Sequence, residues 1–167
     1  MPHKPQIAFD QVPPKSPSNL AVLPETLQAA LAQIELMVLT LHHGAAPIHA
    51  LYLDLNVGRH VRHVCDHAQA LLDGVAAAQI NYNFRTRDSE TERSSAFALA
   101  LIASLKTRLG ALHACDTPHA IQVLSEMSFA DAQSGEFQST LARELLYLIN
   151  HTIHHAAYIK LLLSHAG

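Results

Sequence analysis

The residues best suited to chemistry in this chain are histidines placed four positions apart. His151 and His155 lie in the apolar run LARELLYLINHTIHHAAYIKLLLSH, and His63 lies in a second run with a helical pattern. Side chains at positions i and i+4 share one face of a helix, so the first two imidazoles can bind the same ion. A facing helix that carries His63 would supply the third ligand.

Spacing alone is weak evidence, because a chain with 13 histidines contains about one such pair by chance. Two pairs occur here, His63 with His67 and His151 with His155. Both pairs lie among Leu, Ile, Val and Ala, and unpartnered imidazoles are costly to bury in an apolar core. A bound metal would remove that cost, so we predict a metal site formed by His63, His151 and His155.

Three neutral imidazoles would leave a divalent ion with its full positive charge and at least one position open to water or substrate. Imidazole binds zinc, nickel, iron and copper; we predict zinc, with nickel as the alternative. A closed site that also used His67 would be structural or storage-like. Histidines without any metal are the remaining interpretation, and we adopt it for His113, His119 and His165.

Other chemistries find little support. A carboxylate di-iron site needs acidic ligands at helical spacing, but Glu144 lies seven residues before the first histidine of its segment, and Asp66 does not face the same way as its neighbour His67. Cys65 is two residues from His63 and therefore points to another face of the helix; we interpret it as a small buried hydrophobic residue. No glycine-rich phosphate loop and no Ser-His-Asp or Cys-His signature is present.

Composition restricts the class of protein. A chain of 167 residues, 49% of them hydrophobic, can form one domain with a substantial core, yet no run is long enough for a membrane span. The net charge of −3 without a basic cluster argues against nucleic-acid binding. The proline-rich start lacks a secretory signal, and Cys65 and Cys115 make no disulfide framework. We therefore expect a cytoplasmic protein that acts on a small-molecule substrate, can form a homodimer, and binds neither nucleic acid nor membrane.

The chain divides into an arm and a helical domain. Residues 1–22 are predicted to be an extended, proline-punctuated arm, either mobile or packed. Residues 23–167 are predicted to be all-α and to form a four-helix bundle. The helices are expected from Pro24 to the His42-His43-Gly44 stop, from Asn56 to Gly74, from the capping box Ser89-Glu90-Thr91-Glu92 to about residue 113, and from Ser139 or Thr140 to about residue 164.

The connections between these helices carry their own predictions. Residues 45–55, AAPIHALYLDL, are predicted to be a loop. Residues 116–138 alternate apolar and polar side chains in part, which indicates a short hairpin before the last helix. The connection of residues 75–88 is long enough to cross the whole bundle, so the order of helix directions stays open.

A polar stretch, NYNFRTRD, precedes the third helix and concentrates hydrogen-bonding side chains in an otherwise apolar protein. Tyr82, Arg85 and Arg87 are candidates to line the mouth of the metal pocket, because an arginine can hold the carboxylate of a substrate or cofactor with two hydrogen bonds. The alternative is a solvated loop in which these arginines pair with Asp88 or Glu92.

Three segments resemble the DinB family, also called the DinB/YfiT-like metalloenzymes. They are LNVGRHVRHVCDHAQALLDG, INYNFRTRDSETE and RELLYLINHTIHHAAYI, which cover the second to fourth helices. The resemblance implies a four-helix bundle of DinB/YfiT type with metal ligands at His63, His151 and His155, the same residues that spacing and burial select. Many members follow the last histidine with Arg-Gly-Gln, whereas this chain has Ala-Ala-Tyr at residues 156–158.

Relatives in that family with an assigned activity use a low-molecular-weight thiol in isomerisation or transfer reactions. We therefore expect a metal-dependent enzyme that activates a thiol or water at the open position, as a thiol S-transferase, an isomerase or a hydrolase. The competing hypothesis is a non-catalytic helical bundle with a structural or storage metal. Such a bundle would act through self-association or protein binding, because the first and fourth helices are strongly apolar.

Overall fold

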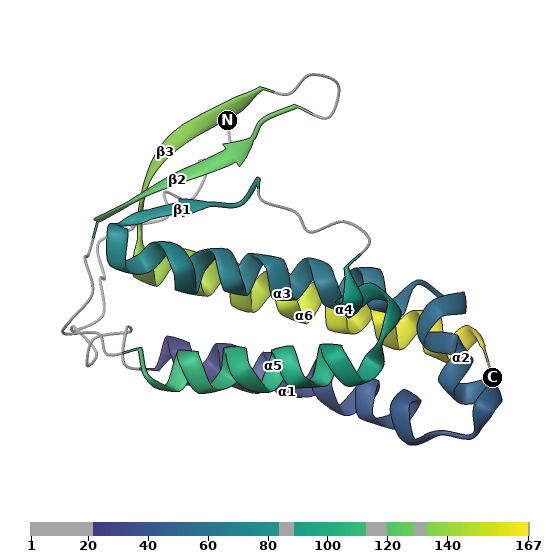
Figure 1. The fold of residues 1–167 in the computed structure, drawn as a ribbon. Coiled ribbons are helices and arrows are strands. Elements are labelled where there is room, and N and C mark those ends of the chain that lie inside the picture. Colours follow the sequence, from purple (N-terminus) through teal and green to yellow (C-terminus); the bar gives the residue numbers. More distant parts are fainter. Residues whose placement is uncertain (1–21, 84–88, 113–119, 129–132, 167) are drawn as a thin grey trace, which may run out of the picture.

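The computed structural model describes residues 22–83, 89–112, 120–128 and 133–166. In these ranges the chain is mostly helical, and a small three-stranded sheet covers one side of four long helices (Figure 1). The long helices are α1 (Leu23–His43), α3 (Val57–Gly74), α5 (Ser95–Gly110) and α6 (Leu141–His165). The other elements are the short helices α2 (Ala46–Asp54) and α4 (Glu90–Arg93), the 3₁₀ turn η2 (Val75–Ala77), and the strands β1 (Gln79–Asn81), β2 (Ala120–Glu126) and β3 (Ser134–Thr140).

Apolar residues at helical spacing give each long helix a buried face. In α1 this face consists of Leu27, Leu31, Ile34, Val38 and Leu41, which follow one another in steps of three or four residues and are all buried. Helix α1 packs against α5 and α6, and α3 packs against the same two helices. Helices α1 and α3 therefore lie diagonally opposite, and the core fills the space between the four.

Side-chain contacts establish the helix directions. His42 at the end of α1 lies 2.8 Å from the hydroxyl of Ser95 at the start of α5, so these helices are antiparallel. Asp73 and Arg108, near the ends of α3 and α5, form an ion pair of 2.6 Å, so these two helices are parallel. Helix α6 runs opposite to α3 (Figure 1). The long connection after α3 thus returns the chain to the end of the molecule where α3 began.

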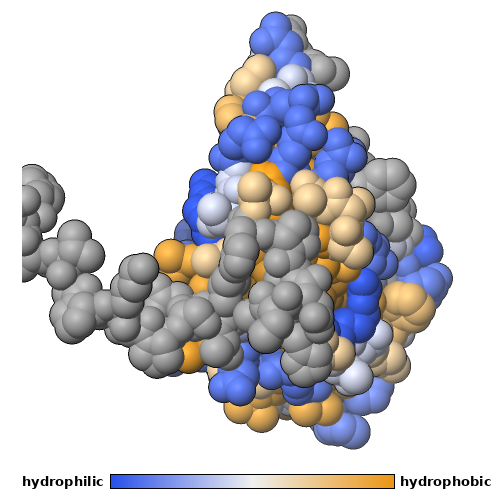
Figure 2. All heavy atoms as spheres, turned by 90° about the vertical axis from the view of Figure 1, so that its left-hand side faces the viewer, coloured by the Kyte–Doolittle hydropathy of each residue, from blue (hydrophilic) through white to orange (hydrophobic). Residues whose placement is uncertain are grey.

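The sheet corrects the prediction of an all-α protein. Strand β2 is central, parallel to β1 and antiparallel to β3. A parallel pair needs a crossover, which α4 and α5 provide between β1 and β2. The β2–β3 hairpin is the one predicted before the last helix. The buried hydrophobic residues of the sheet are Ile80 of β1 and Ile121 and Val123 of β2. Viewed along the helices, the sheet rises above them, and hydrophilic residues cover most of its upper part (Figure 2).

Residues 46–54 form helix α2, so the prediction of a loop here is wrong. Pro47 lies in the first turn of α2, where the missing N–H of proline breaks no helical hydrogen bond. The buried Tyr52 donates a hydrogen bond of 2.6 Å to the carbonyl of Thr91 and so ties α2 to α4. Within the segment predicted to be a loop, the proline thus marks the start of a helix.

The helix boundaries agree closely with prediction, but the caps differ. Asn56 precedes α3 with a positive φ of 56° and makes no side-chain cap hydrogen bond. Ser89 also makes no side-chain cap hydrogen bond. The single helix expected after Ser89 is divided into α4 and α5. Ser94 causes the division: its backbone is extended, and its hydroxyl accepts a hydrogen bond of 3.2 Å from the amide of Phe97. Thr140 caps α6, as predicted.

Some predictions fall on residues outside the described ranges. They include the arm up to residue 21, the loop arginines Arg85 and Arg87, and Cys115. The non-metal histidines His113 and His119 also lie there. Among the helices that the structure does describe, none combines the length and the apolar character that a bilayer crossing requires.

Candidate metal centre

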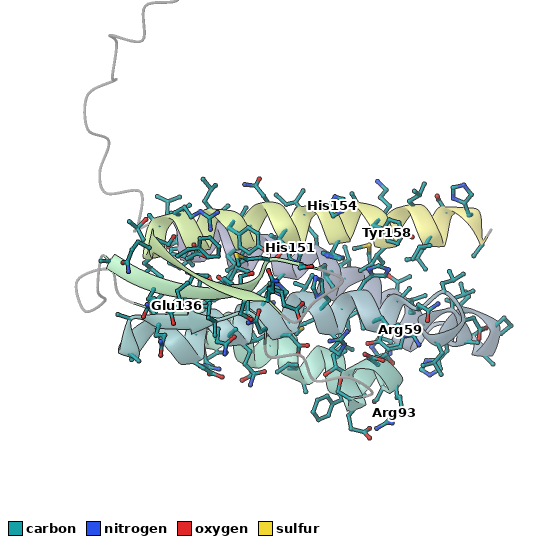
Figure 3. The ribbon with its side chains drawn as sticks, turned by 90° about the horizontal axis from the view of Figure 1, so that it is seen from above. Arg59, Arg93, Glu136, His151, His154 and Tyr158 are labelled. Atoms are coloured by element: carbon teal, nitrogen blue, oxygen red, sulfur yellow. The ribbon has the colours of Figure 1, made fainter. Side chains whose placement is uncertain are left out.

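Helices α3 and α6 bring the three predicted ligands together. His63 lies in the middle of α3, and His151 and His155 lie one turn apart on α6. One ring nitrogen of each lies within 4.8 Å of the other two, and the ring centroids are 4.6 to 4.9 Å apart. Seen from above, His151 lies between α6 and α3 beside the hairpin (Figure 3). The three histidines are therefore close enough to bind one metal ion.

Burial keeps these three rings neutral. Desolvation, followed by the charges of neighbouring histidines, lowers the pKa of His63 to about 3 and the pKa values of His151 and His155 to about 4. Nε2 of His151 is buried and has no hydrogen-bond partner. Neutral imidazoles offer lone pairs to divalent transition-metal ions. This donor set fits such an ion, which would also give Nε2 of His151 a partner.

His60 and His67 also contact the three histidines. Nδ1 of His60 lies 3.2 Å from Nδ1 of His155, so one of these nitrogens must donate and the other accept. When His155 donates, its Nε2 is left free to bind a metal. Nδ1 of His67 donates to the carbonyl of His63 over 2.9 Å, and its ring lies 4.7 Å from that of His151. His67 is nevertheless not a member of the group of converging nitrogens.

A pocket of about 370 Å³ opens beside the histidines, between the sheet and the two helices. Its walls include His63, His67 and His151 together with Tyr82 and Tyr147. A ligand of a few non-hydrogen atoms could therefore approach the candidate metal position from this side. Such access is what an open coordination position requires.

Tyr82 is the predicted pocket residue that the structure describes, and it lies in the wall of this pocket. It follows β1 directly, and its ring stacks on His67 at 5.2 Å with an angle of 17° between the planes. Its hydroxyl donates a hydrogen bond of 3.0 Å to Glu144. Burial, and after it the charge of Glu144, raises the pKa of Tyr82, so the phenol stays protonated and acts as a donor.

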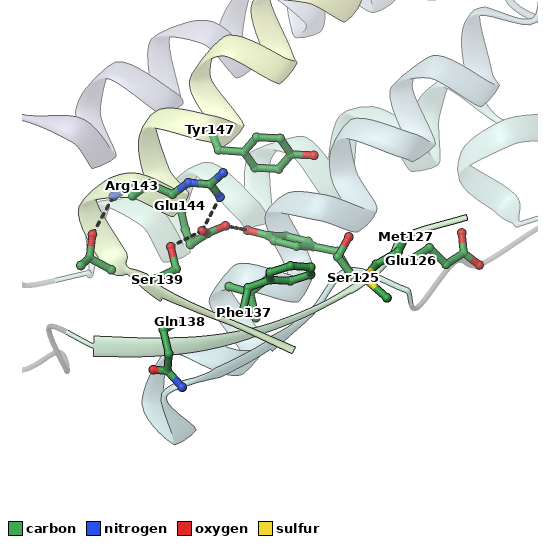
Figure 4. Close-up of a pocket in the computed structure, with 12 residues that line it drawn as sticks. Ser125, Glu126, Met127, Phe137, Gln138, Ser139, Arg143, Glu144 and Tyr147 are labelled. Carbon is green, nitrogen blue, oxygen red and sulfur yellow. Dashed lines mark hydrogen bonds and ion pairs between the residues drawn. The ribbon is translucent and has the colours of Figure 1, made fainter. Parts of the chain in front are cut away.

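Glu144 is a site residue that sequence reasoning missed, because we considered it only as an iron ligand. Its side chain is fully buried and accepts hydrogen bonds from Tyr82, Ser139 and Arg143 (Figure 4). Three donors offset the cost of burying a carboxylate. The sequence contains only a weak indication of this role for Glu144, because an acidic residue in the first turn of a helix is usually stabilised by the helix dipole alone.

Two other residues were missed, although the sequence contained a signal for both. Tyr147 lies four residues before His151 and stacks on it at 5.6 Å. His60 lies three residues before His63, on a neighbouring part of the same helix face.

The interpretation of Cys65 as a buried hydrophobic residue is confirmed. Its side chain is 1% exposed, and burial raises the pKa of its thiol to about 12. A thiol in this state is a poor nucleophile and a poor metal ligand at neutral pH. His165 is not among the converging histidines, and its Nδ1 donates to the carbonyl of Leu161 in the last turn of α6.

Comparisons with protein-family models, with curated proteins and with solved structures found no match to this chain. The fold and the site define the general class of the protein. It is a mostly helical protein with a small sheet, in which three histidines from two helices can hold a divalent metal ion.

Proposed function

We propose that the protein is a metal-dependent enzyme with a DinB/YfiT-type four-helix bundle, in which His63, His151 and His155 bind one divalent ion. The observation that carries the proposal is the convergence of three neutral imidazoles, one of which has a buried ring nitrogen without a hydrogen-bond partner. Zinc is the proposed ion and nickel the alternative, since both accept imidazole ligands. The three segments that resemble the DinB family support the same assignment.

A small molecule is the proposed substrate, and a low-molecular-weight thiol or water the proposed nucleophile. A divalent ion held only by neutral ligands would lower the pKa of a thiol or water at its open position. The residues around it would shape the pocket: Tyr82 and Tyr147 form aromatic walls, and the bond between His60 and His155 orients a ligand ring. The buried thiol of Cys65 fits the reducing cytoplasm that we propose for the protein.

Replacement of the metal by cobalt tests this proposal, because cobalt absorption reports on coordination. We expect one cobalt ion per chain and a spectrum that changes when azide or a small thiol is added. The His151→Ala variant should lose the ion, whereas a matched variant of the neighbouring exposed histidine, His154→Ala, should keep it. Unchanged cobalt content in His151→Ala would refute the ligand assignment.

A structural metal in a protein-binding bundle is the second candidate function. The observation in its favour is a set of exposed apolar side chains on α1 and α6, namely Leu36, Leu146, Ile153 and Leu161. This function predicts a concentration-dependent mass in sedimentation experiments and a cobalt spectrum indifferent to added ligands. It also predicts unfolding in chelator, because a structural metal contributes directly to the free energy of folding.

A further inference from the structure

The candidate ligands on α6 belong to a longer row of side chains on one face of that helix. Arg143, Tyr147, His151 and His155 follow one another at steps of four residues. The guanidinium of Arg143 lies 5.6 Å from the ring centroid of Tyr147, and Tyr147 stacks on His151. At 1.5 Å per residue, Arg143 lies about 12 Å along the helix from His151.

A groove follows this row. The pocket beside the histidines shares Tyr82, Ser125, Glu126, Met127 and Tyr147 with a second pocket of about 730 Å³, which reaches Arg143. The two pockets therefore adjoin between the hairpin and the first half of α6. Figure 4 shows the second pocket, with Tyr147 on α6 and Phe137 on β3 on opposite sides.

The chemistry of the groove changes along its length. Histidines line the inner end, and aromatic and thioether side chains line the middle, namely Tyr82, Met127, Phe137 and Tyr147. At the outer end Arg143 is accompanied by the hydrogen-bonding side chains of Gln138 and Thr140. A ligand that matched these three parts would have a metal-binding atom, an apolar body and an anionic end.

Arg143 is held in place but retains donors for a ligand. Its Nη1 donates to the buried Glu144 over 2.7 Å, and its side chain is 65% exposed. A guanidinium has five N–H donors, so this bond leaves others that can bind a carboxylate. Glu144 has its own donors in Tyr82 and Ser139, and Glu126, the other acidic residue in the walls, is exposed and has an interaction partner.

We infer that this groove is the substrate-binding site and that it selects elongated ligands with a carboxylate at the Arg143 end. The inference rests on the proposed function, because the inner end of the ligand is held by the metal at the three histidines. Arg143 is thus a specificity-determining residue, while Glu144 positions both Arg143 and Tyr82.

Matched thiols test this inference on the cobalt-substituted protein. The probes are 6-mercaptohexanoate, the equally long neutral 6-mercaptohexan-1-ol, and 3-mercaptopropionate, which carries the carboxylate on a shorter chain. Binding is followed by the cobalt absorption spectrum, and dissociation constants are compared. We expect 6-mercaptohexanoate to bind about tenfold more tightly than the alcohol, which corresponds to one charge-assisted hydrogen bond. The shorter acid should gain little from its charge.

Substitution of Arg143 by glutamine should remove this preference and leave azide binding unchanged. Arg93→Gln is the matched control, because it removes one exposed arginine from α4, on the far side of the molecule (Figure 3). Equal affinities of the acid and the alcohol for the wild-type protein, with azide still binding, would overturn the inference and leave the proposed function intact. A spectrum that responds to no ligand, azide included, would overturn both. Because the thiol comparison uses the wild-type protein, it remains decisive if Arg143→Gln fails to fold.

Discussion

The described part of the chain contains two groups of neighbouring histidines, and they differ in what surrounds the ring nitrogens. The first group lies between α3 and α6 and forms the candidate metal centre. The second lies at the corner between α1 and α2, where the ring of His42 is 5.0 Å from that of His43 and 6.0 Å from that of His49. Short distances between rings are therefore common to both groups.

The two groups differ in the direction of their nitrogens and in their exposure to water. At the α1–α2 corner, Nδ1 of His42 is bonded to the hydroxyl of Ser95, and His43 and His49 are exposed. Within the described residues, converging ligand nitrogens occur only between α3 and α6. A metal centre thus requires lone pairs that point to a common position and that neither water nor protein donors already satisfy.

The largest expected difference between the groups is in metal content. His63→Ala and His151→Ala should abolish stoichiometric metal binding, because each removes one of three ligands. His42→Ala and His49→Ala should leave the metal content at about one ion per chain. Elemental analysis of the purified variants, made without added nickel, provides the measurement. If His42→Ala lost the metal while His63→Ala and His151→Ala kept it, the metal centre would have to be assigned to the α1–α2 corner.

A smaller effect is expected from His60, which contacts a ligand without being one. His60→Ala should weaken metal binding about 10- to 100-fold, because residues that orient a ligand ring commonly contribute that much. In His60→Gln the amide oxygen can accept the hydrogen bond from Nδ1 of His155, so most of the affinity should return. Competition with a chelator of known affinity gives the dissociation constants. Identical losses in both variants would indicate that His60 contributes only packing.

The response to pH should also distinguish the centre from exposed histidines. The pKa values of His63, His151 and His155, near 3 to 4, lie below the ordinary value of about 6.5, so the rings need no deprotonation before they bind metal. Metal affinity should fall less than about tenfold between pH 7 and pH 5, whereas three ordinary histidines would lose several orders of magnitude. Isothermal titration at several pH values can measure this.

The same pKa values determine how the metal-free protein responds to acid. The unfolded chain binds protons below pH 6.5 that the folded rings do not bind, so acid favours unfolding. Stability is therefore fully present above about pH 6.5 and falls as the pH decreases toward 4. Urea unfolding of the metal-free protein should show this decline. Constant stability from pH 7 to pH 4 would contradict the lowered pKa values.

The smallest effect is expected at the α1–α2 corner. His42→Ala removes a hydrogen bond between α1 and α5 and should lower the free energy of unfolding by about 1 kcal/mol. Ser95→Ala should have a similar effect, and the double variant should cost less than the sum of the two. Urea titrations would measure all three values. Full additivity would mean that the bond between His42 and Ser95 contributes nothing to stability.

Local patterns in the sequence were enough to predict the long helices and the candidate ligands. The apolar spacing of α1, the N-cap Thr140 and the four-residue step from His151 to His155 are all properties of neighbouring residues. His63 could be added because a facing helix with a buried histidine face was itself evident from its pattern. These features depend on helix geometry alone.

Features that depend on distant partners were not predictable in the same way. Strand β1 has three residues and exists because β2 pairs with it after a crossover of two helices. Glu144 accepts hydrogen bonds from its sequence neighbours Ser139 and Arg143, but also from Tyr82, which is 62 residues away. The break at Ser94 is different, because serine is a favourable cap at either position and the local sequence does not distinguish Ser94 from Ser89.

The candidate ligands lie on two helices, α3 and α6, that are far apart in the sequence, and this separation affects the kinetics of folding. His60 and His155, which meet beside the metal position, are 95 residues apart in the sequence. While α6 is unpacked from α3, His63 and the two ligands of α6 cannot reach the same ion, so at most two imidazoles hold it. The third ligand joins only when the two helices pack, and we therefore expect the ion to stabilise mainly contacts that form late in folding. A bound metal should slow unfolding far more than it accelerates folding, so its biological effect would be a longer lifetime of the folded chain.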